Sequence, residues 1–143
     1  MFDWILECLF IASPAMVSVG LGTLIFTRPE KKVYYKGLIV GSVFSGVIIC
    51  GLLALIGGGM GWLVMNSPST GNGIAGGLLA GMGYVLILVA PVIGGVYAAL
   101  SALGAYLFSA PLSENVTLGK RFGRAVMGSL VGVNVGLWIL SLV

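Results

Sequence analysis

Two polar side chains inside otherwise apolar runs are the candidates for chemistry. Glu7 lies at the start of the first apolar run, and Asn134 is a carboxamide well inside the last one. A carboxylate at a helix end can attract cations, and a carboxamide within a span can contact an ion or bond to a neighbouring helix. The plain interpretation places Glu7 at the membrane interface and gives Asn134 an interhelical hydrogen bond. The alternative is a polar or pore-lining role for both.

The groups that enzymes use most are scarce in this chain. It has no histidine, the commonest general base and metal ligand. Cys8 and Cys50 are far apart, and each lies in or beside an apolar run, which favours packing over a disulfide or a metal pair. No phosphate-binding loop or nucleophile elbow occurs. We therefore expect neither an enzyme nor a bound cofactor or metal.

The placement of charge indicates the class of protein. Of 143 residues, 7 are Lys or Arg and 4 are Asp or Glu, and no charged residue occurs from Gly37 to Ser113. A soluble globule needs charged surface to stay dispersed, whereas a membrane span needs about 20 mainly apolar residues. The chain is predicted to be an integral membrane protein.

Four apolar runs predict an all-α polytopic fold of four transmembrane helices, arranged as two hairpins in a single membrane domain. The expected spans are residues 8–27, 37–65, 74–110 and 125–143. The third is too long for a bilayer core of about 30 Å, so it must tilt, project or break. Pro91 is the expected kink, and an unwound segment lining a cavity is the alternative.

Basic residues set the expected orientation. They lie between the first and second spans and between the third and fourth: Arg28, Lys31, Lys32, Lys36, Lys120, Arg121 and Arg124. The positive-inside rule places these on the cytoplasmic side and both termini on the outer, non-cytoplasmic side. The basic residues are expected to meet lipid head groups or a docking partner rather than nucleic acid.

A short motif occurs twice. Residues 21–29 and 103–111 both read L-G-x-x-(I/L)-F-(S/T)-x-P, and each leads into a basic segment and a glycine-rich run. This indicates two hairpins of the same orientation, related by an axis along the membrane normal. Coincidence is the alternative, because Leu and Gly are abundant here.

Small residues recur at four-residue spacing along three of the expected spans. Residues four apart share a helix face, and small ones let two backbones approach closely in lipid. The expected packing residues are Gly41, Ser42, Gly46, Gly77, Gly81, Gly94, Ala98, Gly128, Gly132 and Gly136. So many rows exceed one pairwise contact, which predicts a homo-oligomer or a complex with other membrane subunits.

The residues Arg28-Pro29-Glu30, together with tandem hairpins and glycine-rich helices, resemble the double-hairpin proteolipid subunits of rotary ATPases. The resemblance implies ring-like packing. Those subunits carry an ion-binding carboxylate in the second or fourth span, which this chain lacks; Asn134 lies in roughly that region.

Two functions follow from the sequence. The first is a non-enzymatic membrane subunit that packs through small-residue helix faces. The second is a small channel or transporter with a path between subunits or along the kinked third helix.

Overall fold

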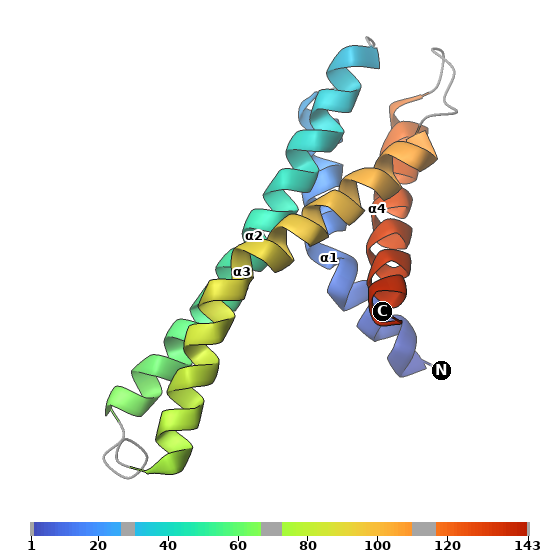
Figure 1. Cartoon of the computed structure of the whole chain (residues 1–143). Helices are drawn as coiled ribbons and strands as arrows, with labels where there is room; N and C mark the ends of the chain where they lie inside the picture. The colour runs from blue at the N-terminus through green and yellow to red at the C-terminus, as the bar shows by residue number, and fades with distance from the viewer. Residues whose placement is uncertain (1, 27–30, 67–72, 110–116, 143) are drawn as a thin grey trace.

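The fold is an all-α bundle, as predicted. The computed structural model describes residues 2–26, 31–66, 73–109 and 117–142. Within them lie four helices, each long and apolar enough to cross a membrane. They are α1 (Phe2–Ile25), α2 (Lys31–Asn66), α3 (Ile74–Ser109) and α4 (Leu118–Leu140) (Figure 1). The chain is a multi-pass membrane protein.

The helices extend beyond the apolar runs at their charged ends. α2 begins at Lys31 and α4 at Leu118, so Lys36, Lys120 and Arg124 are helical rather than in loops. Lys and Arg are good helix formers, and a membrane helix can continue into the head-group layer where its charges meet water. Hydropathy detects the apolar part of each helix and therefore misses these first turns.

α3 runs without interruption through Pro91, so the alternative of an unwound third span is wrong. The helix bends in its middle part, where it turns away from α2 toward α4 (Figure 1). Proline removes one ladder hydrogen bond and bends a helix, but a membrane helix tolerates it when neighbouring helices support the backbone.

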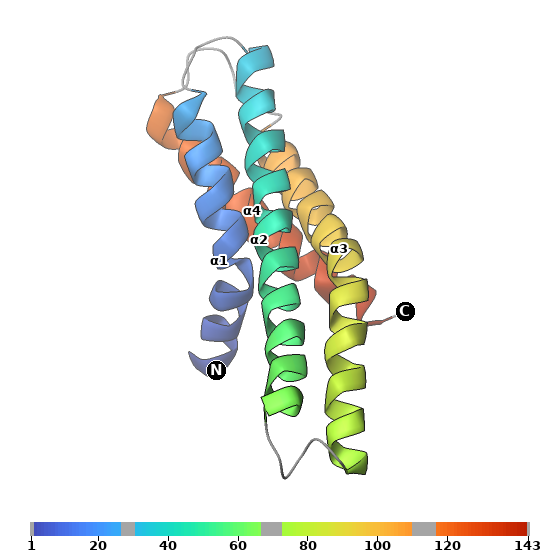
Figure 2. The same cartoon turned by 90° about the vertical axis from the view of Figure 1, so that its left-hand side faces the viewer.

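The helices contact one another in cyclic order. α1 packs on α2, α2 on α3, α3 on α4 and α4 on α1, whereas the diagonal helices α1 and α3 barely touch. The C-terminal ends of α1 and α3 and the N-terminal ends of α2 and α4 lie at one end of the bundle, which we call the basic end (Figure 2). Both termini point toward the opposite end.

The two hairpins repeat one close contact between their helices. A Cβ atom built on Gly22 of α1 would collide with the carbonyl oxygen of Gly37 on α2. A Cβ atom on Gly104 of α3 would collide in the same way with the carbonyl oxygen of Gly128 on α4. Gly22 and Gly104 are the glycines of the repeated L-G motif, so the motif marks a repeated structural contact.

A second contact one turn away repeats as well. A Cβ on Gly41 would lie 2.5 Å from the carbonyl oxygen of Ser18, and a Cβ on Gly132 would lie 2.5 Å from that of Leu100. Ser18 precedes Gly22 by four residues, as Leu100 precedes Gly104. The match in both contacts favours an internal repeat over coincidence.

α2 and α3 are much longer than the other two helices. At about 1.5 Å per residue their 36 residues reach about 54 Å, against about 36 Å for the 24 residues of α1. The excess forms a projecting pair, residues 51–66 and 73–89, which we call the distal hairpin. It extends past the ends of α1 and α4 (Figure 2). Gly57 and Gly83 let its two helices pack closely, since a Cβ atom built on either glycine would lie 2.5 Å from the carbonyl oxygen of the other.

The interior is built from small side chains, which let the backbones approach closely. Fully buried residues include Ala15, Val19 and Ala125, and serines of all four helices are buried as well. Within the described residues, the hydroxyls of Ser42 and Ser101 have no hydrogen-bond partner. Ser45 and Ser129, by contrast, donate to backbone carbonyls of their own helices.

Candidate functional site

The seam between α1 and α4 is packed less tightly than the one between α2 and α3. Gly46 and Gly94 bring the backbones of α2 and α3 together, with a Cβ on Gly46 only 2.5 Å from the Gly94 carbonyl. On the other seam Gly20 of α1 faces the ring of Phe122 rather than a backbone. Two cavities, of about 480 and 350 Å³, lie along the α1–α4 seam.

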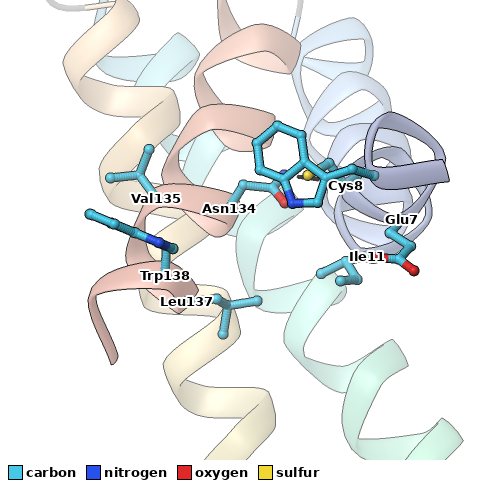
Figure 3. Close-up of a pocket in the computed structure, with 8 residues that line it drawn as sticks. Glu7, Cys8, Ile11, Asn134, Val135, Leu137 and Trp138 are labelled. Atoms are coloured by element: carbon cyan, nitrogen blue, oxygen red, sulfur yellow. Dashed lines mark hydrogen bonds between the residues drawn. The ribbon is translucent and has the colours of Figure 1, made fainter. Parts of the chain in front are cut away.

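The larger of these two cavities brings together the polar residues that the sequence singled out. We call it the terminal cavity, because its lining comes from the first turns of α1 and the last turns of α4 (Figure 3). It is lined by Trp4, Glu7, Cys8, Ile11, Asn134, Val135, Leu137 and Trp138. Glu7 and Asn134 therefore line the same cavity, although they lie far apart in the sequence.

Asn134 ties the two helices together at this cavity. Its Nδ2 donates to the carbonyl oxygen of Cys8 on α1 at 3.2 Å and to that of Leu130 on α4 at 2.9 Å. The first bond is interhelical and the second returns to its own helix. Asn134 thus links α4 to α1 beside the cavity, which is a structural role.

The rim carries the carboxylate and two indoles. Glu7 is exposed, and Trp4 and Trp138 are 69% and 64% exposed. Figure 3 shows Glu7 on α1 and Trp138 on α4 on opposite sides, with Ile11 and Leu137 between them. Cys8 is a half-buried free thiol. The cavity therefore combines an apolar floor, one carboxylate and aromatic surface.

A third cavity is larger but offers less chemistry. It measures about 650 Å³ and lies where the hairpins diverge, among residues of all four helices. Its polar atoms are already engaged: Ser13 donates to the Phe10 carbonyl at 2.8 Å, and the Tyr97 hydroxyl donates to the Ile11 carbonyl at 2.6 Å. The remaining lining is apolar, as suits a lipid-facing crevice.

Most of the expected packing residues contact another helix of the same chain. Gly41 faces α1, Gly46 and Gly94 face each other, and Ala98 lies beside Gly46. Ser42 is buried. Three residues of α4 meet α3: Gly128, Gly132 and Gly136. Gly77 and Gly81 differ, because nothing in the described chain lies within 4 Å of a Cβ placed on either.

The basic residues lie away from the terminal cavity. Lys36, Lys120 and Arg124 are exposed at the basic end, and Arg121 is half-buried there. Arg28 and the side chains of Lys31 and Lys32 fall outside what the structure describes. The geometry thus separates a basic end from a cavity whose charged side chain is Glu7.

Sequence reasoning missed one linking residue, Tyr97. Its hydroxyl contacts two backbone groups of α1, the Ala15 amide and the Ile11 carbonyl. The available signal was the repeat: aligning the two L-G motifs places Tyr97 at the position of Ala15, a large residue where the other hairpin has a small one.

The fold and the cavity define a multi-pass helical membrane protein with a small amphipathic site near its termini. No protein-family model, curated protein or solved structure matches the chain significantly.

Proposed function

We propose that this chain is a non-enzymatic integral membrane subunit that assembles with further copies of itself or with other membrane subunits through its distal hairpin. The observation that carries the proposal is a set of glycines with nothing opposite them. Within the described chain, a Cβ would meet no atom within 4 Å at Gly51, Gly58, Gly59, Gly61, Gly73, Gly77 and Gly81.

These open glycines carry a cost that the isolated chain does not recover. A glycine inside a helix is about 1 kcal/mol less favourable than alanine. At Gly46 or Gly94 that cost is offset by close contact between helices, since lipid provides little hydrophobic drive for helix association. At Gly77 and Gly81 the described residues make no such contact. A second membrane helix resting on this face would provide it.

Exposed apolar side chains alone would not support assembly. Met65 is 89% and Ile74 is 87% exposed, but lipid covers such residues without penalty. The open glycines are the specific feature, because lipid tails gain nothing from a glycine that a leucine would not give.

Native mass spectrometry from lipid nanodiscs tests the proposal by counting subunits. The wild-type chain is expected to form a defined oligomer, and the double substitution of Gly77→Leu and Gly81→Leu is expected to lower the subunit count. Gly95→Leu is the matched control, because Gly95 is also open but lies outside the distal hairpin. A wild-type monomer with no co-purifying membrane subunit contradicts the proposal. A large closed ring would favour the proteolipid-like arrangement without its ion-binding carboxylate.

A small channel or transporter is the second candidate, and the terminal cavity is the observation that favours it. Glu7 and Asn134 line one cavity that lies between helices near the chain ends. Ion flux in proteoliposomes tests this, with Glu7→Gln and Asn134→Leu expected to alter the rate. Flux absent from the wild type, or unchanged in both variants, excludes a path through this cavity.

The basic end is expected to face the cytoplasm. There Lys36, Lys120 and Arg124 would each gain about 1 kcal/mol from attraction to anionic head groups. Labelling with a membrane-impermeant maleimide tests this in a chain whose two cysteines are replaced by alanine. A cysteine at Asn66 is expected to react from outside intact cells and a cysteine at Lys36 only after lysis. The reverse pattern contradicts the orientation.

A further inference from the structure

We propose that the terminal cavity binds an alkylammonium, that is, a positively charged amine carrying a hydrocarbon chain. The site consists of the Glu7 carboxylate, the indoles of Trp4 and Trp138, and an apolar floor formed by Ile11 and Leu137. This inference does not depend on the proposed assembly, because the residues that line the cavity belong to α1 and α4, whose terminal ends lie apart from the distal hairpin (Figure 1).

The size and composition of the cavity suit a small amphipathic ligand. Its volume of about 480 Å³ falls within the range of small-molecule sites, roughly 300 to 1,000 Å³. Such sites are mostly apolar with a few polar groups that fix orientation. Here the polar groups are Glu7 and Asn134, and Asn134 already spends its amide hydrogens on the Cys8 and Leu130 carbonyls. The carboxylate of Glu7 is the charged group of the lining and therefore the one that selects a ligand by charge.

The internal repeat shows that the hairpin fold does not require these side chains. Aligning the two L-G motifs pairs Glu7 with Val89, and aligning Gly37 with Gly128 pairs Trp138 with Val47. By the same alignments Trp4 corresponds to Leu86 and Asn134 to Val43. The equivalent position in the other hairpin holds an aliphatic residue, and it too lies in a helix. The carboxylate and the indoles are additions confined to the α1–α4 seam.

The charge of the ligand follows from what surrounds the cavity. An indole face attracts cations through its quadrupole, and a nearby carboxylate adds a direct charge interaction. None of the residues that line the cavity is basic, and the described Lys and Arg side chains lie at the opposite end of the bundle. An anionic head group would find no partner here, so the site favours a cation.

The hydrocarbon chain follows from the setting. The α1–α4 seam continues from the cavity along apolar residues such as Val17 and Leu21, which are exposed on the outer face of α1. A ligand whose ammonium rests at the rim can lay its tail along this face within the bilayer. Two sources share this chemistry: the amine head group of a membrane lipid, and a free amphipathic amine.

The test measures binding of dodecyltrimethylammonium to the full chain in nanodiscs made of phosphatidylglycerol, by the change in tryptophan fluorescence. The chain carries Trp62→Phe, because Trp62 lies on the distal hairpin and would add background. Dodecyl maltoside, with the same tail and a neutral head, is the matched ligand control. Saturable binding of the cation, with at least about tenfold weaker binding of the neutral ligand, is expected.

Matched variants assign the effect to the site. Glu7→Gln and Trp138→Leu are each expected to weaken binding of the cation about fivefold. Asp3→Asn is the control for Glu7: it removes a carboxylate from the same helix at a position that does not line the cavity. Helical content by circular dichroism verifies that each variant is folded. Glu7 and Trp138 both lie on the exposed rim of the cavity, so the two variants are expected to fold.

The outcomes separate cleanly. Weaker binding in Glu7→Gln and Trp138→Leu but not in Asp3→Asn supports the site. Equal losses in Glu7→Gln and Asp3→Asn would show general charge attraction and overturn the proposal, as would equal affinity for the neutral ligand. If nanodiscs of phosphatidylethanolamine block the probe, the natural occupant is a lipid amine. If they do not, while the variants behave as expected, the occupant is a free amphipathic amine.

Discussion

Tyr97 of α3 and Ala15 of α1 occupy the same position of the two repeated hairpins and meet each other across the bundle. The phenolic oxygen of Tyr97 accepts a hydrogen bond from the Ala15 amide at 3.3 Å. Its hydroxyl donates to the Ile11 carbonyl at 2.6 Å. α1 and α3 otherwise barely touch. One hydroxyl group therefore joins the two diagonal helices, and it does so in the turn that contains Pro14.

Pro14 interrupts the hydrogen-bond ladder of α1 one residue before Ala15. Proline has no amide hydrogen, so the Phe10 carbonyl lacks its usual ladder partner. Ser13 supplies a replacement by donating to that carbonyl at 2.8 Å. The small side chain of Ala15 then leaves room for the Tyr97 ring to approach.

Replacing Tyr97 with phenylalanine is expected to destabilise the chain by about 1 kcal/mol, because two backbone groups of α1 lose their shared partner. Unfolding in mixed micelles of increasing sodium dodecyl sulfate measures this. Tyr84→Phe is the control, since Tyr84 is 67% exposed. Equal effects of the two substitutions would show that the hydroxyl of Tyr97 contributes nothing special.

Alanine at Gly46 is expected to destabilise strongly, by about 2 kcal/mol or more, because its Cβ would lie 2.5 Å from the Gly94 carbonyl and neither backbone can move without separating α2 from α3. Alanine at Gly95 is expected to be neutral or slightly stabilising, since that side of α3 is open and alanine favours the helix. The same unfolding assay compares them. A tolerated Gly46→Ala would contradict the close α2–α3 packing.

The repeat predicts matched costs at equivalent glycines. Gly22→Ala and Gly104→Ala each place a methyl group against the carbonyl oxygen of the partner helix. Both are expected to destabilise by a similar amount, within about 1 kcal/mol of each other. A large effect at one position and none at the other, in the same micelle system, would argue that the hairpins only look alike.

Alanine at Ser101 is expected to be neutral or stabilising by up to about 1 kcal/mol, because the substitution removes a buried hydroxyl that has no partner among the described residues. Alanine at Ser129 serves as the comparison. That serine is equally buried but donates to the Val126 carbonyl at 2.8 Å. The unfolding midpoints of the two variants are compared in the same assay. A large loss of stability in Ser101→Ala would show that the Ser101 hydroxyl makes a hydrogen bond.

Composition was enough to predict the number of spans and the hairpin arrangement. A charge-free stretch from Gly37 to Ser113 leaves few alternatives to membrane helices. The repeated L-G motif also pointed to a real structural feature, since its glycines sit at equivalent helix contacts. Helix bounds were predicted less well, because helical geometry continues through charged turns that hydropathy excludes.

The site was only half visible from sequence. Glu7 and Asn134 stand out as polar residues in apolar surroundings, but their meeting depends on how α1 packs against α4. That packing is decided by contacts such as Gly20 on Phe122, which no local pattern reveals. The Tyr97 link was hidden for the same reason. A tyrosine in a membrane span usually packs against other helices or lies at the interface. The partner of Tyr97, Ala15, lies 82 positions earlier in the sequence.

The unequal helix lengths impose a condition on the surrounding lipid. α1 and α4 match a hydrocarbon layer of ordinary thickness, whereas α2 and α3 would have to tilt far beyond the usual range of up to about 40° to fit the same layer. Each ångström of hydrophobic mismatch costs a fraction of a kcal/mol. Thicker lipid beside α2 and α3 would lower this cost, as would a tilt of the pair or its projection beyond the hydrocarbon layer. The bilayer around this chain is therefore expected to differ between its two flanks.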